Sequence, residues 1–209
     1  MPLLAVQGLD VARGGLPVLQ GVTFRVPAGG ALILRGPNGI GKTTLLRTIA
    51  GLQSATAGSV AAPADSIAYG AHADGLKATL TVFENLAFWA KIYGNEDVKA
   101  ALAALDLAGL SNRLSHNLSA GQKRRLGLAR LLVTGRPIWV LDEPTVSLDA
   151  ASVALFLAAL RSHMQGGGAV LMATHIDPGL DEAQTLDLSE FKATATAFRG
   201  AFDDEAGFT

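Results

Sequence analysis

A loop of eight residues, Gly36-Pro-Asn-Gly-Ile-Gly-Lys42-Thr43, constrains the fold of this chain more than any other segment. It matches the pattern G-x-x-x-x-G-K-[ST], in which backbone N–H groups surround phosphate oxygens. An apolar run over 31–34 precedes the loop, and a helical pattern over 43–50 follows it and ends at Gly51. The motif requires a strand before it and a helix after it. The sequence therefore predicts a nucleotide-binding α/β domain.

The residue types in the loop suit a triphosphate. Glycine at positions 36, 39 and 41 lets backbone amides approach phosphate oxygens without a side chain in the way. The start of a helix near Lys42 adds the positive end of its dipole. We expect the Lys42 ammonium to meet the β- and γ-phosphates and the Thr43 hydroxyl to bind Mg²⁺. The predicted ATP-binding loop comprises Gly36, Pro37, Asn38, Gly39, Ile40, Gly41, Lys42, Thr43 and Thr44.

Two carboxylates follow a second apolar run. Asp142 and Glu143 come directly after Ile138–Leu141, which has the pattern of a buried strand. At the carboxyl edge of a parallel sheet, both side chains would lie beside the phosphates. We expect Asp142 to bind Mg²⁺, directly or through water, and Glu143 to polarise the attacking water.

Strand and helix patterns alternate along most of the chain. Val18–Val26 alternates apolar and polar residues, as a half-buried strand does. This order predicts a mostly parallel sheet with helices on both faces, and the helical stretch over 80–134 is interpreted as an insertion into it. The other predicted elements are short strands near Ser59–Ala61 and Ile67–Tyr69, helices over Val98–Leu107, Gln122–Leu132 and Ala150–Met164, and a strand over Ala169–Ala173.

The composition argues against several classes of protein. Seventeen basic and eighteen acidic residues give a net charge of −1, which does not favour a broad electrostatic contact with nucleic acid. Hydrophobic residues make up 49% of the chain, yet no stretch approaches the roughly 18 apolar residues of a membrane span. The chain has no cysteine, and its first residues lack the basic segment of a secretory signal. We therefore expect a cytosolic protein, and the apolar excess favours a protein partner.

With the loop and the carboxylates, Leu118-Ser-Ala-Gly-Gln122 makes the chain resemble an ATP-binding cassette (ABC) nucleotide-binding domain over nearly its whole length. This segment resembles the family's signature motif, with Ala120 where glycine is commoner. Ser147-Leu-Asp149 resembles the loop after the catalytic glutamate, and His175 matches the switch histidine. The predicted fold is therefore an α/β P-loop NTPase over 1–209. Its core, about 1–79 and 135–209, has an N-terminal antiparallel β part, and the helical signature subdomain covers about 80–134.

The same resemblance implies a head-to-tail homodimer with two ATP molecules at its interface. The signature residues would meet the γ-phosphate held by Lys42 of the other subunit, where a helix N-terminus suits an anion. His175 would hydrogen-bond the γ-phosphate and orient the water. The implied catalytic set is Glu143, His175 and Lys42, and the opposite subunit contributes Ser119, Ala120, Gly121, Gln122 and Asp149.

Two positions depart from the family pattern. The usual glutamine, about eight residues before Leu80-Thr-Val82, is replaced by His72. An imidazole can still ligate Mg²⁺ or donate to a water, so His72 is a candidate ligand of ATP and metal, with a plain loop histidine as the alternative. The aromatic residue that usually stacks on adenine falls near Arg13. A guanidinium plane can stack on a base, although an arginine in a glycine loop is often solvated.

Four longer sequence segments narrow the resemblance to one subclass of the family. Residues 36–47, 72–77, 118–125 and 139–145 resemble the ATP-binding subunit of the bacterial haem exporter of cytochrome c maturation. That family implies ATP hydrolysis with Mg²⁺ at the cytoplasmic face of the inner membrane, by a peripheral protein bound to integral membrane subunits of the haem exporter permease type. No residue resembles a haem ligand, so we do not expect haem to bind this chain directly.

Two alternatives to this subclass stay open. One is the ATPase subunit of another ABC exporter or importer, which would have the same motifs. The other is a soluble ABC ATPase that acts on nucleic acid or ribosomes. The single phosphate loop and the short helical insertion without heptads argue against this soluble class, and the near-zero net charge does so too.

Two further features have plainer interpretations. Trp89 and Tyr93 lie on the apolar face of one predicted helix, which favours a place in the helix core. Part of that face, with Phe83, can instead form a groove for a helix of a membrane subunit. The basic run Lys123-Arg-Arg125 is interpreted as a solvated helix face, with support of the dimer interface as the alternative.

Overall fold

The computed structural model describes residues 2–95 and 97–194. Its strands are β1 (Pro2–Arg13), β2 (Leu16–Pro27), β3 (Ala31–Arg35), β4 (Ala57–Ala61), β5 (Ile67–Gly70), β6 (Ile138–Asp142), β7 (Ala169–Ala173) and β8 (Gln184–Asp187). Its α-helices are α1 (Lys42–Ile49), α2 (Val82–Tyr93), α3 (Val98–Ala104), α4 (Ala120–Val133) and α5 (Ala150–Gln165). Short 3₁₀ helices lie at Ala108–Leu110, Ser115–Asn117 and Leu188–Phe191. Among the described residues, none of these helices combines the length and the apolar character needed to cross a membrane.

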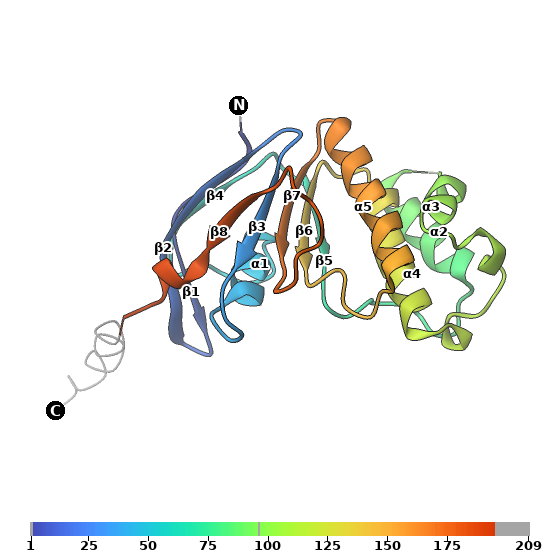
Figure 1. Ribbon diagram of the computed structural model, residues 1–209, viewed down its shortest axis with the longest axis horizontal. Coiled ribbons are helices and arrows are strands. Elements are labelled where there is room, and N and C mark those ends of the chain that lie inside the picture. The colour runs from blue at the N-terminus through green and yellow to red at the C-terminus, as the bar shows by residue number, and fades with distance from the viewer. Residues whose placement is uncertain (1, 96, 195–209) are drawn as a thin grey trace.

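The chain folds around two sheets, which Figure 1 shows side by side. β1 pairs with β2 and β4 in an antiparallel sheet, and the second sheet is parallel with the order β5-β6-β7-β3-β8. β7 lies between β3 and β6, and its Ala173 is in register with Leu34 and with Asp142. The phosphate loop follows β3 and the two carboxylates end β6. Both therefore lie at the same edge of the parallel sheet, as predicted.

Helix α1 lies between the two sheets (Figure 1). Its Leu45, Leu46 and Ile49 are buried in a cluster with inward-facing residues of β1 and β2 and one face of β3, β6 and β7. A fully buried leucine or isoleucine contributes about 1.5–3 kcal/mol relative to an exposed one. This packing fixes the start of α1, and with it the phosphate loop, against the edge of the parallel sheet.

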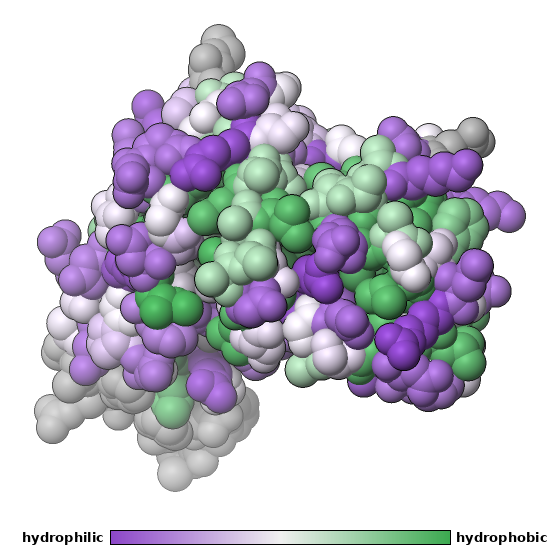
Figure 2. All heavy atoms as spheres, turned by 45° about the vertical axis from the view of Figure 1, so that its right-hand side comes forward, coloured by the Kyte–Doolittle hydropathy of each residue, from purple (hydrophilic) through white to green (hydrophobic). Residues whose placement is uncertain are grey.

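Helices α2, α3 and α4 form a helical block beyond the other face of the parallel sheet. Figure 2 brings this side of the molecule forward and shows hydrophobic residues interspersed with hydrophilic ones on its surface. The packing of the buried residues around α4 is continuous from the helical block to β6 and α5. The division into a core and a separate subdomain near residues 79 and 135 therefore stays a prediction.

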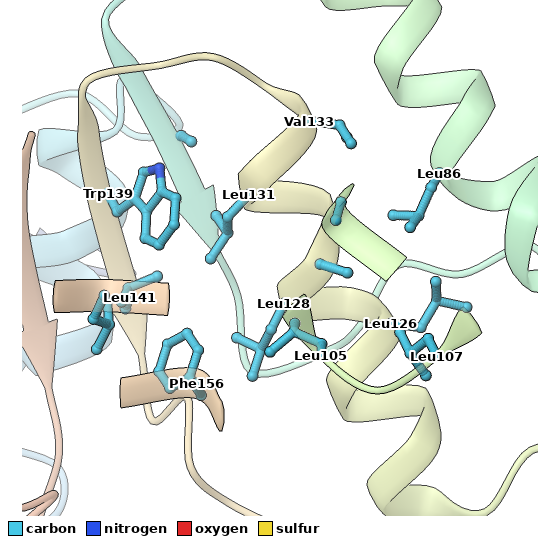
Figure 3. Packing of buried hydrophobic residues seen from close by; sticks show 14 of the residues in the cluster. Leu86, Leu105, Leu107, Leu126, Leu128, Leu131, Val133, Trp139, Leu141 and Phe156 are labelled. Carbon is cyan, nitrogen blue, oxygen red and sulfur yellow. The ribbon is translucent and has the colours of Figure 1, made fainter. Parts of the chain in front are cut away.

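Helix α4 is buried on two sides (Figure 3). Leu131 faces Trp139 of β6, whereas Leu126 lies on the side of Leu107 and of Leu86 from α2. A helix with apolar contacts on both sides has little freedom to shift alone. The first turn of α4, which contains the signature residues, is thus held firmly relative to the sheet.

The α/β fold with a parallel sheet and an antiparallel N-terminal sheet confirms the predicted fold class. Two strands, β1 and β8, were not predicted from the sequence. β1 contains register shifts that break its alternation, and β8 is a short strand with mostly exposed residues at the edge of the sheet. The helix predicted over Val98–Leu107 ends at Ala104, because the chain turns at Asp106, where φ is 51°.

One expectation about helix α4 was wrong. The run Lys123-Arg-Arg125 is not a solvated face, because Arg124 is only 5% exposed and the Arg125 side chain only 13%. Because α4 is packed on both sides, Arg124 and Arg125 donate to backbone carbonyl oxygens of neighbouring segments. Arg13 is the last residue of β1 and is exposed directly before the turn at Gly14 and Gly15, so its contact with the base stays a prediction.

Candidate nucleotide-binding site

The phosphate loop has backbone conformations that glycine adopts readily and other residues do not. Gly36, Gly39 and Gly41 have φ angles of 137°, 83° and 117°. A Cβ atom at Gly41 would lie 3.2 Å from side-chain atoms of Leu19 and Val18 in β2. Space as well as φ therefore disfavours a larger residue there. The loop depends on glycine for its shape, as the motif predicts.

Lys42 and the first turn of α1 are prepared for an anion. The Lys42 Nζ donates to the carbonyl oxygens of Gly36 at 2.7 Å and Pro37 at 3.3 Å, which hold the ammonium across the loop. Gly41 is the N-cap of α1, and neither a side-chain cap nor an acidic residue is present in the first turn. The first amides of a helix have no intrahelical acceptor. Those of α1 can therefore bind phosphate oxygens, aided by the helix dipole.

A cavity of about 210 Å³ lies over this loop. It brings together the phosphate loop, the predicted metal ligands Thr43 and Asp142, the predicted base Glu143, and Arg13 from the end of β1. The lining residues are Arg13, Val18, Asn38, Gly39, Gly41, Lys42, Thr43, Thr44, Asp142 and Glu143. Because β1 and β6 belong to different sheets, only the folded chain places Arg13 and the carboxylates around one cavity.

The two carboxylates at the end of β6 have different environments. Asp142 is 3% exposed, and the Tyr69 hydroxyl lies 3.5 Å from its Oδ2. Burial first, and then the charge of Asp142, raise the pKa of Tyr69 to about 12, so the phenol stays protonated beside the carboxylate. Glu143 has a φ of 48°, and its N–H donates to the carbonyl oxygen of Ala173 at 2.9 Å. Such a left-handed conformation costs on the order of 1–3 kcal/mol and persists only where neighbours hold it.

Glu143 and His175 lie next to each other. The His175 Nδ1 is 3.0 Å from the Glu143 Oε2, with the two side chains 54% and 16% exposed. The two groups are not aligned for a hydrogen bond, and among the described residues this buried Oε2 has no other hydrogen-bond partner. Arg35, the last residue of β3, donates to the carbonyl oxygens of Thr174 at 3.1 Å and Ile176 at 2.8 Å, on either side of His175. Because Glu143 lines the cavity beside a histidine, its carboxylate suits a group that binds water there.

The cavity offers few protein ligands to a metal ion. Thr43 and Asp142 line it, and the described part of the chain contains no group of three or more His, Cys, Asp or Glu side chains placed to hold a metal. Mg²⁺ usually binds through one or two protein oxygens together with substrate phosphates and water. A hydroxyl and a buried carboxylate beside a phosphate loop fit this pattern.

A second hollow, of about 360 Å³, lies where α4 and α5 begin. Ser119 caps α4: its Oγ accepts from the N–H of Gln122 at 3.2 Å, and the Gln122 Oε1 accepts from the N–H of Ser119 at 3.0 Å. Asp149 caps α5 by accepting from the N–H of Ser152 at 2.8 Å. Hydrogen bonds from Ser152, first from its side chain and then from its backbone, lower the pKa of Asp149. The lining residues are Ser119, Gly121, Gln122, Arg125, Ser147, Asp149 and Ser152.

His72 lies apart from the other predicted metal ligands. It is exposed and lines a third hollow, of about 180 Å³, with residues of α4. Thr43 and Asp142 line the cavity over the phosphate loop instead. The contribution of His72 to ATP or metal binding stays a prediction.

The sequence analysis did not assign a role at the site to three residues, Tyr69, Arg35 and Arg124. Arg35 ends an apolar strand directly before the glycine loop, and Arg124 precedes the apolar Leu128 by four residues on the same helix face. A cation at the end of a buried strand, or on an apolar helix face, is a signal that it has backbone or carboxylate partners. Tyr69 carried no such signal, because a tyrosine in a strand is common.

Comparisons with known proteins agree with this geometry. The family model for the ABC transporter matches residues 19–146. The cytochrome c biogenesis ATP-binding export protein CcmA of Rhodobacter capsulatus is 67% identical over 206 residues, which cover 97% of this chain and 96% of that protein. The protein of the same name from Cereibacter sphaeroides is 64% identical over 207 residues, which cover 99% of each chain.

Solved structures have the same fold. An ABC transporter ATP-binding protein from Pyrococcus furiosus superposes with a TM-score of 0.81 at 25% identity, covering 91% of this chain and 99% of that one. The structure of an ATP-binding subunit of an ABC transporter superposes with a TM-score of 0.82 at 24% identity. The match covers 98% of this chain and 95% of that one, and it shows similarity of fold alone. The family model spans more than half of the chain, and the relatives match nearly all of it. The chain belongs to the ABC transporter family, as an ATP-binding protein of the cytochrome c biogenesis export type.

Proposed function

We propose that the chain is the ATP-hydrolysing subunit of an ABC exporter that powers haem export or delivery across the bacterial inner membrane for c-type cytochrome biogenesis. The observation that carries the ATPase part is one cavity lined by the phosphate loop, Asp142 and Glu143. The assignment to export is supported by the identity to cytochrome c biogenesis ATP-binding export proteins. The cargo itself is inferred from the resemblance of the motifs.

In this proposal, the loop amides and Lys42 bind the triphosphate. The Lys42 Nζ exchanges its two carbonyl acceptors for phosphate oxygens, with which it makes stronger, charge-assisted hydrogen bonds. Mg²⁺ bound by Thr43 and Asp142 would neutralise charge on the phosphates. The Glu143 carboxylate, which lines the cavity, accepts a proton from the attacking water, and His175 beside it donates to the γ-phosphate.

Two assignments complete the proposed nucleotide site. Arg13 would stack its guanidinium plane on the base, because it lines the cavity next to the phosphate loop. His72 would reach the nucleotide or the metal only after movement of its loop, since it lines a different hollow in this structure.

Hydrolysis in this proposal needs a second copy of the chain. The signature residues and Asp149 line a hollow separate from the cavity over the phosphate loop. A head-to-tail homodimer would place the start of α4 of one subunit on the ATP of the other and form two equivalent sites. The size of the cavity supports this arrangement. Its volume of about 210 Å³ is below the roughly 300–1,000 Å³ of sites that enclose a ligand.

The helical block offers a surface for the integral membrane subunits. Phe83, Phe88 and Ile92 of α2 are 40%, 43% and 56% exposed, and Lys77 lies over the ring of Phe88 at 5.0 Å. Trp89 is half-buried in the packing of the same helix, which confirms its predicted place in the helix core. Exposed apolar residues on one helix support docking of an apolar helix from a permease subunit. The chain would then sit peripherally on the cytoplasmic face of the inner membrane.

The Glu143→Gln variant tests the proposed catalysis. We expect the rate of ATP hydrolysis to fall by about 100-fold or more, since a general base contributes roughly 10²–10⁴-fold. Binding of a fluorescent ATP analogue should be retained, and size-exclusion chromatography with MgATP should show a trapped dimer. Glu182→Gln is the matched control, because Glu182 forms an exposed ion pair with Arg161. A Glu143→Gln protein that hydrolyses ATP at the unmodified rate would remove the assigned base.

Co-purification tests the transporter assignment. The tagged full-length chain should be recovered from membranes with integral membrane subunits, and double substitution of Phe83 and Ile92 by serine should weaken that recovery. Recovery with ribosomes or nucleic acid and without a membrane subunit would reject the assignment.

A further inference from the structure

The Arg124 side chain joins three segments around the proposed catalytic centre. It lies five residues after Ser119, the N-cap of α4, and is 5% exposed. Its guanidinium nitrogens lie 2.8–3.4 Å from six oxygen atoms, which share its five N–H donors. These are the carbonyl oxygens of Ala71, His72, Asp142, Glu143 and Pro144 and the Oδ1 of Asp74.

The arrangement uses the shape of the guanidinium group. Nε donates to Pro144 at 3.0 Å and Nη2 to Glu143 at 2.8 Å, whereas Nη1 donates to the segment 71–74. One rigid plane therefore holds the end of β6 and the segment after β5 at a fixed separation. A lysine has three donors at a single point and cannot reproduce this fork. Asp74, with its side chain 25% exposed, supplies the opposite charge.

The backbone of Glu143 is held from two sides. Its N–H donates to the carbonyl oxygen of Ala173 in β7, and its own carbonyl oxygen accepts from Arg124. Between these two bonds the residue has the left-handed φ of 48°. A strained residue keeps its conformation only while its surroundings hold it. Loss of the bond from Arg124 would let this turn relax and move the Glu143 carboxylate.

We propose that Arg124 is a positioning residue for ATP hydrolysis, which ties the signature helix α4 to the backbone of Glu143 and to the segment 71–74. Arg124 does not line the cavity over the phosphate loop, so it acts through Glu143 and not on the nucleotide. A displacement of the segment 71–74 relative to α4 is thereby transmitted to the carboxylate. The inference rests on the proposed role of Glu143 as the base.

Gly127 gives an independent way to disturb this link. It follows Arg124 by about one turn of α4, and a Cβ atom at Gly127 would lie 3.0 Å from both the Cβ and the Oδ1 of Asp74. A contact this tight means that alanine there must displace Asp74, the acidic partner of Arg124, by a few tenths of an ångström. Alanine is also a better helix former than glycine by about 1 kcal/mol, so Gly127→Ala does not weaken α4 itself.

The test uses the full-length chain with Arg124→Lys, Arg124→Met and Gly127→Ala. Steady-state ATPase assays give kcat and KM, titration with a fluorescent ATP analogue and Mg²⁺ gives the affinity, and thermal unfolding checks the fold. We expect kcat to fall roughly 10- to 100-fold, because a displacement of about 1 Å can cost 10²-fold. KM and the analogue affinity should change little. If Arg124→Met does not fold, the kcat values of Arg124→Lys and Gly127→Ala still test the proposal.

Arg161→Met is the matched control. Arg161 also donates to a carboxylate and a carbonyl oxygen, those of Glu182 and Gly179, both at 2.9 Å, but on the surface. The kcat of the Arg161→Met variant should equal that of the unmodified chain. An unchanged kcat in Arg124→Lys and Gly127→Ala would overturn the proposal. A parallel loss of kcat and analogue affinity would also overturn it, since it would indicate a general structural role.

A double variant separates this inference from the proposed function. In the Glu143→Gln background, Arg124→Lys should cause little further loss, because both changes act on the same carboxylate. If Glu143→Gln alone keeps the unmodified rate, the assignment of the base fails. If Glu143→Gln abolishes hydrolysis and the Arg124 variants do not reduce it, only the positioning role fails.

Discussion

Helices α1 and α4 begin in opposite ways. α1 starts at Gly41, which has no side chain, and no group caps its first turn. α4 starts at Ser119, whose hydroxyl and N–H are both bonded to Gln122. In the proposed dimer both helix starts meet the phosphates of ATP, α1 those of its own site and α4 those of the partner's site.

This difference suggests an order of events. The amides of α1 have no partner to lose, so they can bind phosphate in a single chain. The start of α4 is satisfied by its own capping box and must share or release those bonds to bind an anion. An N-cap bond is worth about 1 kcal/mol. We therefore expect α1 to supply most of the affinity for nucleotide, and α4 to respond only when the γ-phosphate of the partner's ATP is present.

The largest effect should come from Lys42→Ala, which removes the charge at the α1 end. We expect the affinity for MgATP to fall roughly 10- to 100-fold, since hydrogen bonds to charged groups contribute about 1.5–3 kcal/mol. Titration of the monomeric chain with a fluorescent ATP analogue measures this loss. Lys99→Ala, an exposed lysine of α3, is the control and should bind as the unmodified chain does. If Lys42→Ala and Lys99→Ala bind the analogue equally well, the start of α1 is not the main source of affinity for nucleotide.

The next effect should come from Gly41→Ala, which changes the backbone at the start of α1. The φ of 117° and the contacts at 3.2 Å to Leu19 and Val18 both oppose a Cβ. We expect a loss of about 1–3 kcal/mol in the free energy of unfolding, together with weaker nucleotide binding. Chemical denaturation and the same titration measure the two effects.

Gly51→Ala is the matched control for that change. Gly51 has a φ of 73° but open space around a Cβ, and it follows the C-cap of α1, away from the phosphate loop. It should lose stability from strain alone and keep its affinity for nucleotide. Equal affinity losses in Gly41→Ala and Gly51→Ala would show that the shape of the loop start does not matter for binding.

A smaller and different effect is expected from Ser119→Ala at the α4 end. Loss of the cap should cost about 1 kcal/mol of stability, leave nucleotide binding to the monomer unchanged, and reduce dimer formation with MgATP in the Glu143→Gln background. Thr81→Ala is the control, because Thr81 forms the same kind of capping box with Glu84 at the start of α2. Thr81→Ala should lose similar stability without a change in dimer formation. If Ser119→Ala weakens binding to the monomer, the two helix starts do not have separate roles.

The α1 end could be predicted from the sequence because its chemistry is local. Glycines, Lys42 and Thr43 are contiguous, and each has one physical reason to be there. The position of Asp142 and Glu143 was predicted equally well, because the end of a buried parallel strand places both at a known edge of the sheet. The structure brings these groups together around one cavity.

The contacts around α4 could not be predicted in the same way. The sequence shows Arg124 only as part of a basic run, whereas its partners lie near residues 71–74 and 142–144. Such partners are known only once the packing of α4 on both sides is known. The missed strand β1 has a similar cause, since its register shifts depend on how β2 and β4 pair with it.

The smallest effect concerns Asp149 at the start of α5, which shares its hollow with the start of α4. Bonds from Ser152 lower the pKa of Asp149 in the folded chain below its ordinary value, which is about 3.9. Its contribution to stability is therefore complete above that ordinary value and is lost as the pH falls through the lowered pKa. Asparagine is an equally good N-cap and does not titrate.

Asp149→Asn should therefore match the unmodified chain in urea denaturation at pH 7. Below about pH 4, the unmodified chain should lose stability with a slightly steeper slope than the variant. Parallel slopes between pH 5 and pH 3 would show that the charge on this cap does not stabilise the fold. The start of α5 would then resemble that of α4, which is capped by a neutral hydroxyl, and the uncapped start of α1 would remain the exception at this edge of the molecule.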